Sequence, residues 1–411
     1  SNFTFRNRRM TVAAAAPPPR VALADTPIVL LATLAFFIGA LTLTELISVS
    51  QAILFVIGGL MGATLFHASF GFTGGWRKFV KEGRGNSIRA QMLMVGIAAI
   101  AFMPLLALGE VNGQRLVGAF APVGISVIFG AALFGLGMQL GGGCGSGTLF
   151  TVGGGSRRML VTLAFFIIGA LIGTAHLPAW LALPSLPPVN LGQSLGVPLA
   201  IVVTLAALAA VAALTFVLER QRHGSVQNLF GGFWPKGSGW MHGTWPLAFG
   251  ALALAGLNIA TLLVAGHPWH ITAGFGLWGA QIASAIGVPV EQWAFWQVPA
   301  QARALNDTVL ADTVSVMDFG IMLGAALAAG LAGKFAPKAA LPLKSLLAAI
   351  LGGLMMGYGA RLSFGCNIGA LFSGIASGSL HGWLWFACAF GGSLVGIRIR
   401  PWFGLDGEPA K

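Results

Sequence analysis

The chain alternates between long apolar stretches and short polar segments. Each long stretch has about the 20 residues that a helix needs to cross the hydrocarbon core of a bilayer. They predict ten crossings: 27–48, 52–69, 91–108, 117–138, 159–176, 197–218, 246–264, 315–333, 344–361 and 380–397. Glycines interrupt two further apolar stretches, 139–155 and 363–378, which are predicted to enter the membrane without crossing it. Segment 270–287 is ambiguous, and 289–313 indicates a loop or a surface helix.

Composition supports the same class of protein. Of 411 residues, 56% are hydrophobic and only 8% are charged, whereas soluble domains carry about 25% charged residues. The 60 glycines indicate close helix packing and interrupted helices. The chain is therefore expected to be an all-α integral membrane protein with about ten transmembrane helices. Its tryptophans at 269, 293 and 296 are expected in the aromatic belt at a membrane surface.

The basic residues gather on one predicted side of the membrane. With ten crossings and both termini in the cytoplasm, 20 of the 23 lysines and arginines are cytoplasmic, the exceptions being Arg115, Arg303 and Arg361. Basic loops of membrane proteins stay in the cytoplasm. The net charge of +12 is therefore explained by topology, and nucleic acid is not expected as a partner.

The sequence repeats itself at an offset of 222 residues. Segment 130–150, GAALFGLGMQLGGGCGSGTLF, aligns without a gap with 352–372, GGLMMGYGARLSFGCNIGALF. Nine of 21 positions are identical, and Cys144 meets Cys366. A weaker similarity precedes each copy, HASFGF from His67 and HITAGF from His270. Five predicted crossings separate the two cysteines, so the copies are expected to be inverted, which is how many transporters build a site at the midplane.

This repeat predicts two halves that each contain a re-entrant, glycine-rich cysteine loop. The Cys144 loop is expected to enter from the cytoplasm and the Cys366 loop from outside. The predicted parts are a cytoplasmic N-terminal tail, a first half, a cytoplasmic linker, a second half and a cytoplasmic C-terminal tail: 1–26, 27–218, 219–244, 245–397 and 398–411.

The two loops contain the candidate chemistry. Glycine lets backbone approach a ligand closely, and a short helix beginning after each cysteine would point its free N–H groups and positive dipole end at an anion. Thiols are weak, polarizable donors and acceptors, which suits a sulfur-containing solute. The candidate substrate-binding residues are Gly143, Cys144, Gly145, Ser146, Gly147 and Thr148 in the first loop, and Gly365, Cys366, Asn367 and Gly369 in the second.

The motifs GGGCGSGT and SFGCNIGALFSGIASGSLHGW, with HASFGFTGGWR upstream, resemble the YeeE/YedE family of bacterial inner-membrane sulfur transporters. The resemblance covers about residues 50–397. It implies a transporter rather than an enzyme, without a cofactor or metal, that takes up thiosulfate or a related sulfur or selenium species. It also implies that Cys144 and Cys366 line the substrate path, and that a cytoplasmic TusA-like sulfurtransferase is a partner.

One departure leaves the substrate open. Thiosulfate-type members of that family carry a further cysteine in the upstream motif, whereas residues 67–73 of this chain read HASFGFT.

Further polar residues lie near the predicted membrane interior. Arg361 could bind substrate or extend toward the membrane surface. His67, His270 and His381 could relay protons or simply pack, and Cys388 is interpreted mainly as a small apolar side chain.

Two other functions remain open from the sequence. A membrane thiol–disulfide relay would need a Cys144–Cys366 disulfide, with Cα atoms within about 7 Å, and the chain has no CxxC motif. A small-solute channel of aquaporin-like design would use the cysteines only to narrow its pore.

Overall fold

A computed structural model describes residues 24–229, 234–235, 239–335 and 341–406. Within these residues, ten helical segments are long and apolar enough to span a membrane, and each overlaps one predicted crossing. The predicted all-α membrane fold is therefore confirmed. The long helices are α1 (Thr26–Leu46), α2 (Val49–His67), α4 (Asn86–Leu108), α5 (Ile125–Gly141), α7 (Arg157–Leu181), α9 (Val197–His223), α11 (Leu247–Ala265), α14 (Thr313–Leu331), α15 (Leu343–Leu362) and α17 (Leu380–Ile399).

Shorter elements connect these helices. They are α3 (Phe72–Glu82), α6 (Gly145–Gly153), α8 (Leu191–Leu195), α10 (Gly239–His242), α12 (Thr272–Ala285), α13 (Pro299–Asn306), α16 (Ser373–Ala376), a π-helix η4 (Asn367–Phe372), and the 3₁₀ turns η1 (Val290–Gln292), η2 (Ala294–Gln297), η3 (Val309–Ala311) and η5 (Arg400–Phe403). Two antiparallel strand pairs are β1 (Glu110–Val111) with β2 (Gln114–Arg115), and β3 (Val123–Gly124) with β4 (Ser185–Leu186). The ambiguous segment 270–287 contains the 14-residue helix α12, which is too short to cross a bilayer.

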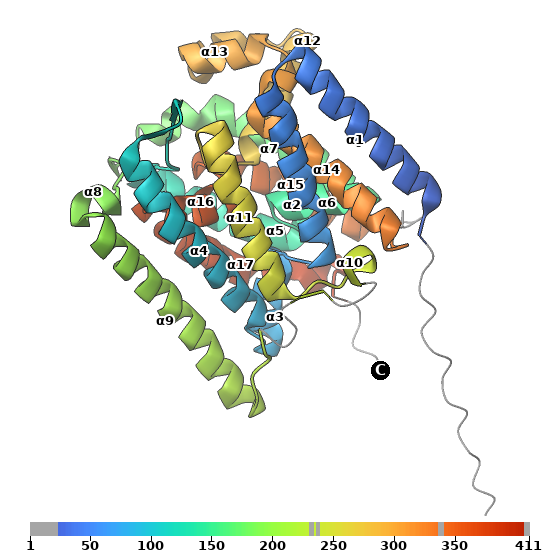
Figure 1. Cartoon of the computed structure of the whole chain (residues 1–411). Coiled ribbons are helices and arrows are strands. Elements are labelled where there is room, and N and C mark those ends of the chain that lie inside the picture. Colours follow the sequence, from blue (N-terminus) through green and yellow to red (C-terminus); the bar gives the residue numbers. More distant parts are fainter. Residues whose placement is uncertain (1–23, 230–233, 236–238, 336–340, 407–411) are drawn as a thin grey trace, which may run out of the picture.

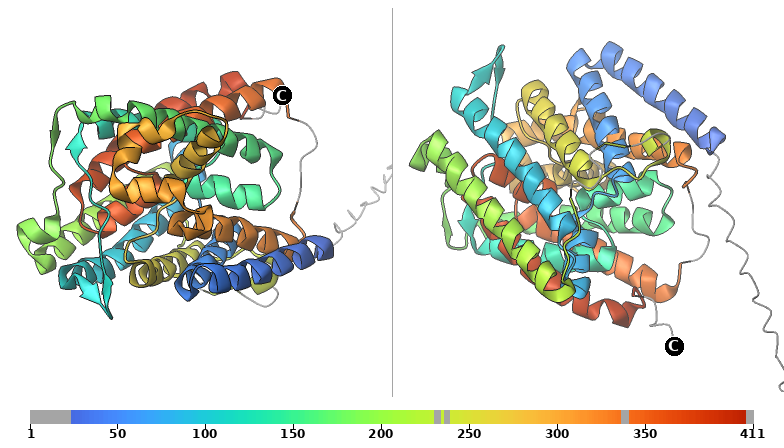
Figure 2. Two further views of the ribbon diagram at one scale, coloured as in Figure 1. Left: turned by 90° about the horizontal axis from the view of Figure 1, so that it is seen from above. Right: turned by 60° about the horizontal axis from the view of Figure 1, so that its bottom comes forward.

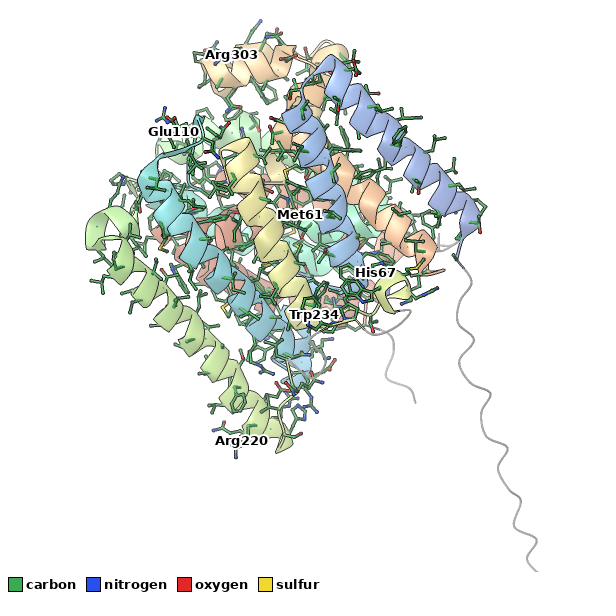
Figure 3. The ribbon with its side chains drawn as sticks, viewed as in Figure 1. Met61, His67, Glu110, Arg220, Trp234 and Arg303 are labelled. Carbon is green, nitrogen blue, oxygen red and sulfur yellow. The ribbon has the colours of Figure 1, made fainter. Side chains whose placement is uncertain are left out.

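The two ends of the molecule are named here by residues that lie at each of them. Figure 3 shows Arg220 at one end, which we call the basic end, and Glu110 and Arg303 at the other, which we call the far end. Helix α13 lies at the far end (Figure 1), which confirms that segment 289–313 contains a surface helix. Helices α2 and α11 run between the two ends (Figure 1).

Helices α1 and α9 lie at the periphery of the bundle (Figure 2). Only 11% of the 18-residue apolar stretch of α1, and 17% of that of α9, is buried inside the protein. Leucine and phenylalanine side chains such as Leu34, Phe37 and Leu214 are exposed there. In a membrane these faces contact lipid, so their exposure is consistent with a spanning bundle.

Helices α5 and α15 cross at glycines. A Cβ added to Gly130 would lie 2.7 Å from the carbonyl oxygen of Gly359, and one on Gly359 would lie 2.5 Å from that of Gly130. Likewise, a Cβ added to Gly137 would lie 2.9 Å from the carbonyl oxygen of Gly352, and one on Gly352 would lie 2.8 Å from that of Gly137. No other residue fits at these positions, so the expectation that glycines permit close packing is confirmed.

The predicted aromatic belt is wrong for two of its three tryptophans. Trp269 is fully buried and Trp296 is 3% exposed. The backbone N–H of Trp269 donates to Asn258 Oδ1 at 2.8 Å, and its carbonyl accepts from Ser373 Oγ at 2.8 Å. The loop after α11 turns back into the protein, which removes Trp269 from the membrane surface.

Candidate functional site

The first cysteine loop connects α5 to α6. Helix α5 ends at Gly141, and the chain turns through Gly142, whose φ of 95° favours glycine. Cys144 is the N-cap of α6, and its Sγ lies 3.4 Å from Ser146 Oγ. The hydroxyl of Thr148 donates to the Cys144 carbonyl at 2.8 Å. All six residues predicted to bind substrate here are buried: Gly143, Cys144, Gly145, Ser146, Gly147 and Thr148.

The second loop follows α15 in a similar way. Phe364, at a φ of 59°, and Gly365, at 148°, both adopt positive φ, a conformation that a phenylalanine adopts only under the constraint of its surroundings. Cys366 is the N-cap of η4, and its Sγ accepts from the N–H of Ile368 at 3.4 Å. A short helix therefore begins after each cysteine, as the sequence predicted.

Asn367 gives the second loop an unsatisfied amide. Its side chain is fully buried, and neither Oδ1 nor Nδ2 has a hydrogen-bond partner among the described residues. Buried polar atoms without a partner are rare in proteins and are commonly satisfied by water or a ligand. Asn367 therefore offers one acceptor and two donors to a solute beside Cys366.

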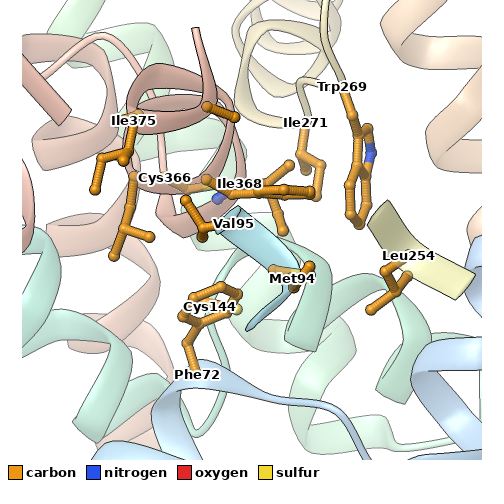
Figure 4. Packing of buried hydrophobic residues seen from close by; sticks show 14 of the residues in the cluster. Phe72, Met94, Val95, Cys144, Leu254, Trp269, Ile271, Cys366, Ile368 and Ile375 are labelled. Carbon is orange, nitrogen blue, oxygen red and sulfur yellow. The ribbon is translucent and has the colours of Figure 1, made fainter. Parts of the chain in front are cut away.

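The two loops touch each other. A Cβ added to Gly145 would lie 3.0 Å from Cys366 Sγ and 3.4 Å from Ile271 Cγ2. Figure 4 shows Cys144, Cys366 and Ile271 in one buried cluster. The thiol of the second loop thus lies against the first residue of the helix that Cys144 caps. All three cysteines of the chain are free thiols.

A cavity of about 350 Å³ reaches the second loop from the far end. Its walls include His267, His270, Phe295, Arg361 and Gly365. The Arg361 guanidinium lies 3.7 Å above the centre of the Phe295 ring, and its Nε and Nη2 have no partner in the described part of the chain. An arginine with unused donors in a cavity is suited to binding an anion.

Two arginines support the first loop from the basic end. Arg158 donates to the carbonyl oxygens of Leu140 and Gly141, at 2.5 and 2.6 Å, and Arg400 donates to that of Gln139. These are the last carbonyls of α5, which have no partner within the helix. Sequence reasoning placed both arginines on the cytoplasmic side but gave neither a role in supporting the end of α5. The signal that could have found them is the end of a helix at membrane depth, whose carbonyls need donors.

The remaining predicted residues separate into two groups. His381 is buried beside the second loop, with its ring centre 6.5 Å from that of Phe364, and His270 Nδ1 would lie 2.8 Å from a Cβ on Gly369. His67 instead packs on Trp245, with ring centres 5.1 Å apart, where α2 ends at the basic end. Cys388 is half-buried on α17.

Sequence reasoning also missed a buried acid. Asp318 on α14 is fully buried, and neither carboxylate oxygen has a hydrogen-bond partner within the described residues. It lies inside the apolar stretch 315–333, where it was counted only as part of a crossing. An acidic residue at membrane depth is itself the signal that could have identified it.

Comparison with known proteins identifies relatives that are transporters by name. A family model described as "Sulphur transport" matches residues 67–395. Two proteins named "Probable transporter YedE" are 31% identical in Salmonella typhimurium and 30% in Escherichia coli, over 160 residues that cover 39% of this chain and 39% of each relative. The chain thus spans less than half the length of these two curated relatives.

Longer but weaker similarity links the chain to proteins named "Thiosulfate transporter TsuA". The one from Spirochaeta thermophila is 26% identical over 280 residues, covering 62% of this chain and 72% of the relative. The one from Escherichia coli is 23% identical over 353 residues, covering 84% and 92%.

Proposed function

Because this chain belongs to the sulphur transport family of membrane transporters, we propose that it takes up thiosulfate or a related small sulfur-containing anion between its two cysteine loops. One observation carries the proposal: Cys366 Sγ lies 3.0 Å from a Cβ position on Gly145, so nothing larger than glycine separates the second thiol from the first loop. A solute leaving one thiol meets the helix N-terminus of the other loop at once. Soft sulfur contacts and backbone N–H groups together suit an anion that has both sulfur and oxygen ends.

The proposed route begins in the far-end cavity. Arg361 attracts the anion there, and the Asn367 amide and Cys366 thiol receive it at the second loop. Cys144 and Ser146 then bind it at the start of α6. Each step replaces water by fixed donors, so the anion retains hydrogen bonds along a path lined by buried residues.

The proposed inverted repetition accounts for how the loops come together. The 222-residue offset pairs Gly130 with Gly352 and Gly137 with Gly359, and the observed contacts are Gly130 with Gly359 and Gly137 with Gly352. Such exchanged contacts are what a two-fold axis produces.

The helix packing favours a boundary between the halves that differs from the predicted linker. Helix α1 packs on α14, and α9 packs in the same way on α4. Helices α4 and α14 directly precede the equivalent helices α5 and α15. We therefore propose that α9 opens the second half, which moves the boundary from 219–244 to the segment between α7 and α9.

We place the basic end in the cytoplasm of a bacterial cell and the chain in the inner membrane, with both termini cytoplasmic, because basic loops stay inside. The tail segments 1–23 and 407–411 lie outside the described residues. Thiol labelling from each side tests this orientation: Cys366 should react through the far end and Cys144 through the basic end. Reaction of both only from the basic end would contradict it.

A TusA-like sulfurtransferase is the proposed partner at the basic end, where it would accept the sulfur species through acidic residues. Lys81 already pairs with Asp406 and Arg84 with Glu219, so the charges to test are Arg77 and Lys78. Changing both to glutamine should weaken crosslinking to a TusA-like protein at low salt, because exposed charges are screened beyond about 8 Å at physiological ionic strength. Arg303→Gln at the far end is the control. Equal binding by all variants would leave topology as the only role of these charges.

The transport function itself is tested in a host that lacks its own sulfur uptake. Cells expressing the chain should accumulate labelled thiosulfate, with sulfate, selenite and other sulfur oxyanions as competitors. Uptake without saturation would favour the channel, and a Cys144–Cys366 disulfide cycling during growth would favour the thiol–disulfide relay. Absence of any sulfur uptake by a correctly inserted protein would contradict the proposal.

A further inference from the structure

Asp318 is a carboxyl group that the route described above does not use. It lies one turn into α14, on the part of that helix nearest the far end, with no exposed surface. Both oxygens lack a hydrogen-bond partner in the described chain. An isolated carboxylate in such surroundings is strongly destabilised, whereas a neutral carboxylic acid is tolerated. Asp318 therefore needs a proton or another cation close to it to remain inside the bundle.

Within the described residues, the neighbours of Asp318 offer it no fixed cation. Its Oδ2 would lie 3.2 Å from a Cβ on Gly274 of α12. Ser315, one turn earlier, is already engaged, because its hydroxyl accepts from Trp278 Nε1 at 2.8 Å and donates to Asp312 Oδ2 at 2.6 Å.

The helices packed on α14 contribute few ionisable groups. Helices α6 and α12 contain none, and α1 contributes Glu45 in its last turn. Helices α2 and α10 contribute His67 and His242, which lie near the opposite end of α14 from Asp318. The start of α12 lies between Asp318 and the cysteine loops: Gly274 meets Asp318, and Ile271 Cγ2 lies 3.4 Å from a Cβ on Gly145, which is also 3.0 Å from Cys366 Sγ. Asp318 is thus linked to the second thiol by a short series of packed residues at the start of α12.

We propose that Asp318 binds a proton that is carried inward together with the anion. This inference rests on the proposed transport function and deepens it by naming the coupling ion. Moving an anion into a cell whose interior is negative costs free energy for each charge moved, and a proton carried with the anion offsets one of those charges. An anion at Cys366 strengthens proton binding at Asp318, and by reciprocity the proton strengthens binding of the anion.

A proton fits the site better than a metal cation. Hard cations need several oxygen ligands, and Ser315 is already committed. Among the described residues, no group of three or more His, Cys, Asp or Glu side chains could hold a metal ion. In the transport cycle, one proton from the far side adds to the carboxylate, and the same proton is released to water at the basic end once the anion has left.

The test uses the full chain reconstituted in vesicles that contain a pH-sensitive dye. With wild type, external thiosulfate should acidify the lumen, and an inward proton gradient should accelerate uptake of labelled thiosulfate. Asp318→Asn keeps the size and removes the titrating group, so it should exchange labelled thiosulfate across the membrane without a pH response. Asp318→Glu should retain coupling, and the exposed Asp307→Asn should behave as wild type.

The outcomes separate the two proposals. Wild type that moves thiosulfate without protons overturns the proton inference alone, and so does Asp318→Asn with a normal pH response. Wild type that moves no thiosulfate overturns the proposed function. If Asp318→Asn fails to fold, the wild-type proton flux and the Asp318→Glu variant still decide the question.

Discussion

Gly145 and Cys366 lie so close that a Cβ on the glycine would be 3.0 Å from the cysteine Sγ. A Cβ added to Gly147 would lie 3.5 Å from Cys144 Sγ, which is an ordinary van der Waals contact. The two glycines are two residues apart in one helix turn and differ mainly in how much space remains beside a thiol. The space beside a thiol is therefore tighter at Gly145 than at Gly147.

Gly145→Ala should obstruct the path between the two loops. The added methyl group forces the second thiol to move, and uptake should fall at least about tenfold, equivalent to about 1.4 kcal/mol. Gly147→Ala should retain a much larger share of activity. Initial uptake rates of labelled thiosulfate at matched protein levels provide the measurement. Similar rates for both variants would show that this contact does not limit passage.

Serine substitutions test the role of sulfur. Cys144→Ser and Cys366→Ser keep nearly the same size but replace a polarizable thiol by a hydroxyl. Uptake should fall nearly as far with serine as with alanine. Cys388→Ala should transport as wild type, since Cys388 lies half-buried on α17 outside both loops. Normal transport by either serine variant would favour a pore in which the cysteines only occupy space.

Arg361 should determine affinity rather than rate. Its guanidinium stacks on Phe295 and has unused donors in the far-end cavity. Arg361→Gln should raise the KM for uptake about tenfold, corresponding to about 1.4 kcal/mol, with a smaller change in maximal rate. Arg361→Lys keeps the charge but not the planar fork, and should give an intermediate KM. A lower maximal rate at unchanged KM would mean that Arg361 acts later in transport.

Glu219 should stabilise the basic end. Its carboxylate is fully buried and accepts from Arg84, Arg89 and the N–H groups of Gly85 and Gln227, at 2.8–3.2 Å. Glu219→Ala leaves Arg89 buried without its counter-charge, which costs about 3 kcal/mol.

Thermal unfolding in detergent measures that loss, and the unfolding temperature should fall by roughly 3–4 °C. The exposed Glu291→Ala serves as the control. An unchanged unfolding temperature for Glu219→Ala would mean that water replaces the carboxylate.

Much of the architecture could be predicted because the bilayer imposes a length and an apolar composition on each crossing. The cysteine loops were equally predictable, since glycine and cysteine recur in register at Cys144 and Cys366. The aromatic belt failed at Trp269, because hydropathy does not reveal that a loop folds back toward Asn258 and Ser373. The inverted orientation of the halves stays a prediction that the exchanged glycine contacts support.

The sequence by itself determined the membrane class, the ten apolar segments, the family and the two cysteine loops, because these follow from local composition and short motifs. Only the tertiary structure decided which distant groups meet: Cys366 against Gly145, Arg158 on the end of α5, and Asp318 with no partner inside the bundle. A contact between residues of different helices depends on helix crossing and depth, which leave no mark on the local pattern. The charge or thiol is visible in the sequence, but its surroundings are set by the fold.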